Sequence, residues 1–167
     1  MSRERTWEPH TVELAIRSLV NSLSRAVIVV PIDCRGMSKV LTLNGAHSGC
    51  YPANFAALIK NEGFLDVLNT TRKIFEKHIQ DPSVTSLYLV FVDNSGQHRS
   101  VAAAHTFHKL LCSDSRCHVS GSAHPVAAKT PGCNWCCECK EPRRGWPEQT
   151  LEAFKIASGA WAFWPWQ

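Results

Sequence analysis

Hydrophobic positions along the chain occur either at helical spacing or in short continuous runs. Apolar side chains three and four residues apart form one face of a helix, whereas a short β-branched run is typical of a strand covered on both faces. Apolar residues have helical spacing in 11–22, 52–80, 99–111 and 148–163. They form continuous runs in 26–32 and 86–92. Strands separated by helices predict an α/β protein with a small, mostly parallel sheet and strand–helix–strand crossovers.

Local signals divide this pattern further. The residues Asn61-Glu62-Gly63 interrupt the long helical region, so we expect two helices within 52–80. A short run at 117–122 predicts a third strand. We expect the whole chain, 1–167, to form one domain, with a core at about 11–122, a Cys-rich loop at 123–147 and a C-terminal helix at 148–163.

Composition narrows the class of protein. The chain has 167 residues, of which 44% are hydrophobic and 19% charged, so we expect a folded rather than a mostly disordered chain. Its longest apolar stretch, 26–32, is far shorter than the roughly 20 residues of a membrane span, and its beginning has no secretory-signal pattern. We therefore expect a cytoplasmic protein without a membrane partner. The formal net charge of +4 permits an anionic partner without requiring one.

The most informative segment joins the second run to the next helix. A small-residue loop at a helix N-terminus lets several N–H groups converge on one anion, at the positive end of the helix dipole. Arg99 adds a planar fork of donors for phosphate oxygens, and His98 can add a charge near neutral pH. The first run ends in Asp33-Cys34-Arg35, at the sheet edge where α/β proteins bind ligands. We expect Arg99 to be the principal donor, Arg35 to close the site, and Asp33 to orient it.

The spacing of this loop also allows chemistry. Residue-x5-Arg-Ser is the geometry of cysteine-dependent phosphatase loops, but Asp93 stands where their nucleophilic cysteine would be. Two alternatives therefore stay open beside anion binding. One is a phosphoester-processing enzyme with His98 or Asp93 as acid or base, and the other is a polar turn that only caps a helix.

The same residues resemble a known family. Gly96-Gln97-His98-Arg99-Ser100-Val101 is similar to the Gly-Gln-His-Arg-Ser-Val signature of the C-terminal domain of the RapZ family of RNase adapter proteins, and Asp33-Cys34-Arg35 resembles its Asp-x-Arg. The resemblance, which includes Gly63-Phe64-Leu65, covers about 27–111, roughly half the chain. It implies an α/β domain that binds structured small RNA and a phosphosugar through anion loops. The resulting expectation is a non-catalytic domain that binds a phosphosugar, a nucleotide or an RNA backbone through Asp33, Arg35, Asn94, Ser95, Gly96, Gln97, His98, Arg99 and Ser100.

Two features outside that loop suggest other partners. Four clustered thiols, with a C-x2-C spacing, suit a structural zinc ion; reduced loop thiols and a redox role are the alternatives. These are Cys133, Cys136, Cys137 and Cys139. The Trp-rich C-terminus, 161–166, either docks the last helix or offers a surface for a protein partner or a second copy. A zinc-stabilised interaction module is thus a third class of function.

Overall fold

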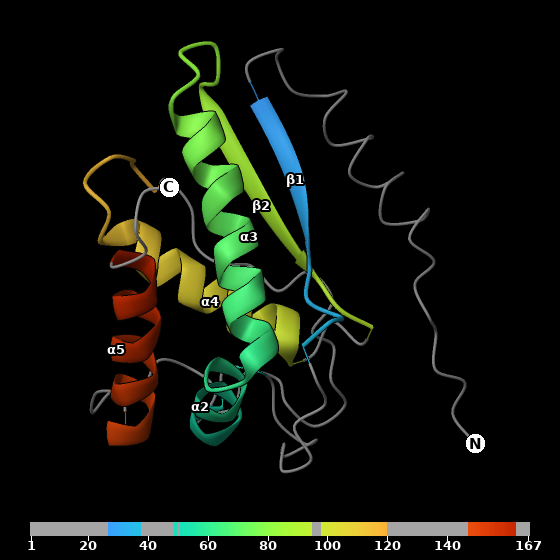
Figure 1. Ribbon diagram of the computed structural model, residues 1–167, viewed down its shortest axis with the longest axis vertical. Coiled ribbons are helices and arrows are strands. Elements are labelled where there is room, and N and C mark those ends of the chain that lie inside the picture. The colour runs from blue at the N-terminus through green and yellow to red at the C-terminus, as the bar shows by residue number, and fades with distance from the viewer. Residues whose placement is uncertain (1–26, 38–48, 50, 95–97, 120–146, 163–167) are drawn as a thin grey trace.

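The architecture is α/β, as the sequence predicts. The computed structural model describes residues 27–37, 49, 51–94, 98–119 and 147–162. In these ranges the two strands pair in parallel, with Val27 opposite Ser86 and Asp33 opposite Val92. The elements, shown in Figure 1, are β1 (Val27–Asp33), α2 (Pro52–Ile59), α3 (Glu62–Ile79), β2 (Ser86–Val92), α4 (Arg99–Cys112) and α5 (Glu148–Ala162).

The element boundaries follow local sequence signals. Strand β2 has the bounds that its apolar run predicts, and the break within 52–80 is confirmed between Ile59 and Glu62. Asn61 caps α3, because its side-chain oxygen accepts a hydrogen bond of 3.0 Å from the Gly63 amide. Pro52 stands in the first turn of α2, where its missing N–H group costs nothing. The ends of these elements are therefore set by residues at or next to each end.

Two expectations about the strands are wrong. Residues 117–119 form no strand, and 120–122 lie outside the described residues. The chain turns back on α4 there instead, since the Asp114 amide donates to the Leu111 carbonyl and the Cys117 amide to the Asp114 carbonyl. Nor are the strands buried on both faces, because residues 27–30 are only half-buried.

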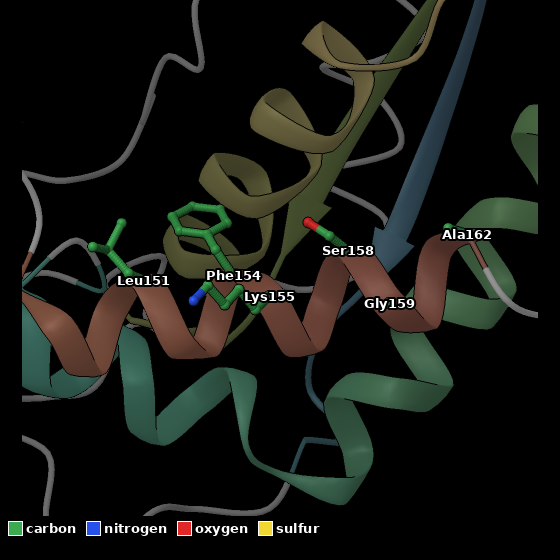
Figure 2. Close-up of a pocket in the computed structure, with 6 residues that line it drawn as sticks. All are labelled: Leu151, Phe154, Lys155, Ser158, Gly159 and Ala162. Carbon is green, nitrogen blue, oxygen red and sulfur yellow. The ribbon is translucent and has the colours of Figure 1, made fainter.

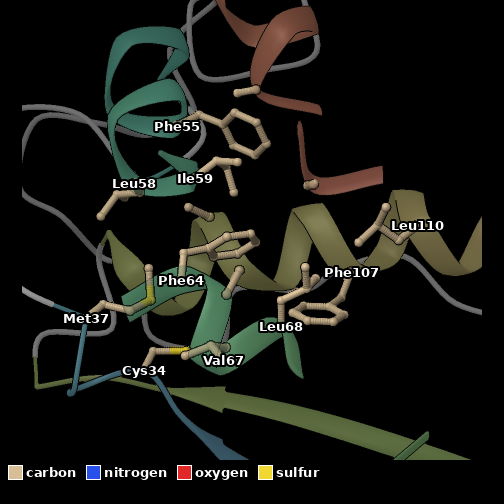
Figure 3. Close-up of a cluster of buried hydrophobic side chains, with 14 of the residues drawn as sticks. Cys34, Met37, Phe55, Leu58, Ile59, Phe64, Val67, Leu68, Phe107 and Leu110 are labelled. Carbon is tan, nitrogen blue, oxygen red and sulfur yellow. The ribbon is translucent and has the colours of Figure 1, made fainter. Parts of the chain in front are cut away.

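One hydrophobic core lies between the sheet and the helices. Figure 3 shows the helices stacked on one side of the strands, with Phe64, Leu68 and Phe107 among the side chains between them. Phe107 is central, since its ring stacks on Phe91 of β2 at 5.1 Å and meets Trp161 of α5 edge-on at 5.8 Å. Helix α5 also packs on α2 through the Phe55–Phe154 ring pair, whose centroids lie 4.8 Å apart. The core thus fixes α4, whose N-terminus faces the candidate site.

Several predicted features cannot be compared with the structure. The helix expected at 11–22, the residues 123–146 of the Cys-rich loop and the end of the chain at 163–167 lie outside the described residues. Within the described ranges, no helix is both long and apolar enough to cross a membrane.

Candidate functional site

The candidate site is built where β1 and β2 end. Both strands run in the same direction, so their carboxyl ends meet at one edge, which we call the carboxyl edge. The pairing extends one residue past β1, because the Cys34 amide donates to the Val92 carbonyl at 2.8 Å. Asp33 and Asp93 therefore stand at the ends of adjacent strands, and α4 begins nearby.

Asp33 and Arg35 form a closed turn on the surface of this edge. The Asp33 carboxylate accepts the Arg35 amide at 2.8 Å, and it accepts the Arg35 side chain through Nε at 2.9 Å and Nη2 at 2.7 Å. The hydrogen bond from the Arg35 side chain is the largest cause that lowers the pKa of Asp33 below its usual value. Both side chains are about half exposed, at 46% for Arg35 and 53% for Asp33. The pair is thus formed, but open to solvent.

Asp93 occupies the N-terminus of α4 from inside the protein. Its carboxylate side chain is fully buried, and one oxygen, Oδ2, accepts the Ser100 amide at 3.0 Å. The same oxygen lies 4.0 Å from Nε of Arg99. The Ser100 amide, which the sequence suggests for a phosphate, is therefore satisfied by a carboxylate of the chain itself. Asp93 takes the place that an external anion takes at other helix N-termini.

Arg99 joins α4 to the loop that follows β1. Its Nη1 nitrogen donates to the carbonyl oxygens of Arg35 and Met37, both at 3.0 Å. Only 13% of the Arg99 side chain is exposed. These contacts use both N–H groups of that nitrogen, so Arg99 holds the Asp33–Arg35 turn in place. The expected principal donor is therefore largely committed to the protein.

Two glycines bring backbone segments together around this edge. A Cβ atom on Gly49 would lie 2.0 Å from the His98 carbonyl oxygen, and one on Gly63 would lie 2.8 Å from the Met37 Cα atom. Only glycine allows such close approaches without a backbone shift. Gly49 thus packs against the first turn of α4, and Gly63 packs α3 against the loop after β1. The sequence predicts neither role, because a close approach between distant segments has no local signal.

The other residues of the expected site differ in burial, and some of them lie outside the described residues. His98 immediately precedes α4, and its buried Nε2 atom has no hydrogen-bond partner among the residues that the structure describes. Asn94, four residues before His98, is exposed. Cys34 is fully buried, and burial raises the pKa of its thiol to about 12, so it is unreactive at neutral pH. Ser95, Gly96 and Gln97 lie outside the described residues.

The expected zinc ligands also lie outside the described residues, at Cys133, Cys136, Cys137 and Cys139. Within the described ranges, no group of three or more His, Cys, Asp or Glu side chains could hold a metal ion. Cys112 and His108 form a pair on α4, with the sulfur 3.9 Å from Nε2. A structural zinc ion stays a prediction that this part of the chain does not test.

Hollows of different size lie at the carboxyl edge and along α5 in the described part of the chain. A small one of about 150 Å³ lies at the carboxyl edge, between Asp33 and α3. Its lining residues are Asp33, Gly36, Gly63, Asp66, Val67 and Thr70. A larger one of about 590 Å³ follows α5, as Figure 2 shows, and its mainly apolar lining includes Leu151, Phe154 and Lys155. The larger hollow contains none of the expected phosphate-binding residues.

A second Asp-x-Arg turn follows α4. The Asp114 carboxylate accepts the Arg116 amide at 3.0 Å, and it accepts the Arg116 side chain through Nε at 2.9 Å and Nη2 at 2.6 Å. This geometry repeats that of Asp33 and Arg35. This turn was not predicted, although its spacing Asp114-Ser115-Arg116 is visible in the sequence.

No protein-family model matches the chain, and neither a curated protein nor a solved structure matches it.

Proposed function

We propose that the protein is a non-catalytic binding domain that holds a phosphate-bearing ligand at the carboxyl edge. One observation carries the proposal: Arg35 and Arg99 meet at this edge beside the N-terminus of α4, since Nη1 of Arg99 donates to the carbonyl of Arg35 at 3.0 Å. A guanidinium group is a donor that phosphate oxygens prefer, and Arg99 holds the backbone of Arg35 at this edge while Asp93 already accepts the Ser100 amide of α4.

The two arginines have different roles in this proposal. Arg99 is mostly buried and holds the loop after β1, so it is a positioning residue. Arg35 is about half exposed, and within the described ranges its guanidinium pairs with the exposed carboxylate of Asp33. Exposed ion pairs contribute little to stability, whereas a phosphate group offers Arg35 a bidentate partner of higher charge. Arg35 is therefore the donor that exchanges Asp33 for the ligand.

The balance of charge predicts a modest affinity. Arg35 and Arg99 are opposed by Asp33 and Asp93 in the same region. Phosphate therefore gains from Arg35 and from the helix dipole, but it is repelled by two carboxylates. We expect binding that weakens steeply as salt is added, because the contacts at Arg35 are exposed.

The environment of Asp93 supports binding rather than catalysis. A carboxylate that attacks phosphorus or transfers a proton must reach the ligand. The side chain of Asp93 is fully buried, and its Oδ2 already accepts the Ser100 amide. This environment suits a carboxylate that fixes the start of α4.

The ligand class follows from the surroundings of Arg35. The hollow of about 150 Å³ beside Asp33 also contains Asp66 and Thr70, whose oxygens can accept hydrogen bonds from hydroxyl groups. A phosphosugar or a nucleotide ribose phosphate offers both groups. An RNA backbone is the alternative that the resemblance of 96–101 to the RapZ signature suggests.

Calorimetric titration with inorganic phosphate tests the proposal. Arg35→Gln should weaken phosphate binding about tenfold, because it removes a charge-assisted bidentate contact. Arg116→Gln is the matched control, since Arg116 forms the same turn at the other end of α4. Equal affinities for the wild-type protein and the Arg35→Gln variant would overturn the proposal.

A further inference from the structure

A histidine and a cysteine form a pair at the end of α4 that lies away from the carboxyl edge. His108 and Cys112 are four residues apart, so their side chains lie on the same face of the helix. The Cys112 sulfur is 3.9 Å from Nε2 and 4.0 Å from Nδ1 of the His108 ring. Cys112 is exposed and His108 is half-buried, so the pair is open to solvent.

The spacing of the two side chains suits a metal ion. Thiolate sulfur and imidazole nitrogen are both ligands of zinc and of copper(I). A zinc ion lies about 2.3 Å from a sulfur and about 2.0 Å from a ring nitrogen, so it separates them by about 3.5 Å at a tetrahedral angle and by about 4.3 Å at most. The observed 3.9 Å lies within this range, so binding requires no movement of the α4 backbone.

The position of the pair favours a cation over a reactive thiol. Cys112 is the last residue of α4, at the end where the helix dipole is negative. The dipole attracts a metal ion there, whereas it opposes the free thiolate that a nucleophilic cysteine needs. Metal binding, in which the ion replaces the thiol proton, is therefore the chemistry that this place on the helix supports.

The other cysteines in the described ranges are less suited to bind an ion. Cys34 is fully buried in the core, and burial raises the pKa of its thiol. Cys117 is half-buried, and its sulfur donates to the Leu111 carbonyl at 3.5 Å. Burial raises the pKa of the Cys117 thiol as well. Of these three cysteines, Cys112 is the exposed one, and it has an imidazole beside it.

We propose that His108 and Cys112 bind a thiophilic metal ion of the zinc or copper(I) class. The chain supplies two ligands, so water completes the coordination of a zinc ion, which takes four. A site with two protein ligands holds its ion less tightly than a structural site with four, so we expect the ion to exchange with solution. This site lies at the other end of α4 from Arg99 and goes beyond the proposed function.

Cysteine alkylation, mapped residue by residue with mass spectrometry, tests the inference on the reduced full-length chain. We expect zinc or copper(I), titrated separately, to slow the reaction of Cys112 with iodoacetamide at least tenfold, because the metal-bound thiolate is withdrawn from reaction. His108→Ala should raise the ion concentration for half-protection at least tenfold, and alanine favours the helix, so α4 is retained. His118→Ala, at an exposed residue after α4, is the matched control and should leave that concentration unchanged.

The number of bound ions gives a second readout. Cys112→Ser changes an exposed residue, which a folded chain tolerates, and should lower the number of ions bound per chain by one in equilibrium dialysis. Alkylation of Cys112 that neither ion slows, an unchanged ion count in Cys112→Ser, or equal half-protection in His108→Ala and the wild-type protein would overturn the inference. None of these readouts involves phosphate, so the inference can fail independently of the proposed function.

Discussion

The two Asp-x-Arg turns of this protein share one local geometry but differ in their surroundings. In both, an aspartate accepts the amide two residues later and a bidentate arginine side chain, with distances that agree within 0.2 Å. The Asp114 side chain is 8% exposed and accepts a hydrogen bond from Nε1 of Trp161 at 3.3 Å. Its partner Arg116 lies over the ring of Phe75, 5.4 Å from the ring centroid. The Asp33 side chain, by contrast, is 53% exposed.

The comparison separates what a motif forms from what it does. An aspartate that accepts the amide two residues on is a self-contained turn, so the spacing occurs wherever the chain needs such a turn. After α4, aromatic side chains cover it and it stabilises the fold. At the carboxyl edge it is open, and its arginine can exchange partners. The Asp-x-Arg spacing is therefore weak evidence for function, and the evidence lies in exposure and neighbours.

The largest expected loss of stability comes from disturbing the close backbone contacts around the carboxyl edge. Gly49→Ala should destabilise the protein by about 3 kcal/mol, because the new Cβ would lie 2.0 Å from the His98 carbonyl and force the first turn of α4 to shift. Urea unfolding measures the change. Gly159→Ala is the control, since beyond its chain neighbours and the backbone of its own helix turn nothing lies within 4 Å of its Cβ position, and it should leave stability equal or higher. Equal losses in both variants would show that Gly49 does not place this edge.

The Asp114–Arg116 turn should make the next largest contribution to the free energy of unfolding. It should do so only at a pH where Asp114 is ionised. The Arg116 hydrogen bond is the largest cause that lowers the pKa of Asp114 from 3.8 to about 2. Because folding lowers this pKa, ionised Asp114 stabilises the fold above pH 4, and the stabilisation disappears as the pH falls to about 2. Asp114→Asn should cost about 2 kcal/mol at pH 7. Urea unfolding between pH 2 and 7 checks this, and a difference that does not shrink in acid would contradict it.

Asp33→Asn should have the smallest effect on stability. The pair is exposed, so we expect a change of less than about 0.5 kcal/mol at neutral pH. Phosphate affinity should rise instead, by a few fold, because Arg35 loses its competing carboxylate. Calorimetry and urea unfolding on the same sample measure both quantities. A large loss of stability without a gain in affinity would show that the open turn has the same role as the covered one.

Sequence patterns predict the elements well where the signal is local. The continuous apolar run gives β2 its bounds, and Asn61 and Gly63 mark the break before α3. The pattern fails at 117–119, where a short run looks like a strand but the backbone amides bond back to the end of α4. A short apolar run does not contain its own hydrogen-bond partners, so periodicity alone cannot decide it.

The candidate site was less predictable than the fold. The sequence identifies Arg35 and Arg99 as residues of one sheet edge, because parallel strands end together. It does not show that Asp93 fills the N-terminus of α4, nor that Arg99 bonds to the Arg35 and Met37 carbonyls, since both depend on three-dimensional distances. The sequence predicts Arg99 as the principal phosphate donor, whereas we propose Arg35 for that role and Arg99 for positioning. Only the exposure and the hydrogen bonds of the two side chains support this assignment.

The most direct test follows the arginine side chains themselves. In a nitrogen-15-labelled protein, the Nε–Hε signals of Arg35 and Arg116 report on two guanidinium groups with the same local geometry. During titration with inorganic phosphate we predict that the Arg35 signal shifts and saturates, while the Arg116 signal stays in place. Equal shifts at both arginines, or no shift at Arg35, would contradict the claim that the carboxyl edge binds phosphate through Arg35.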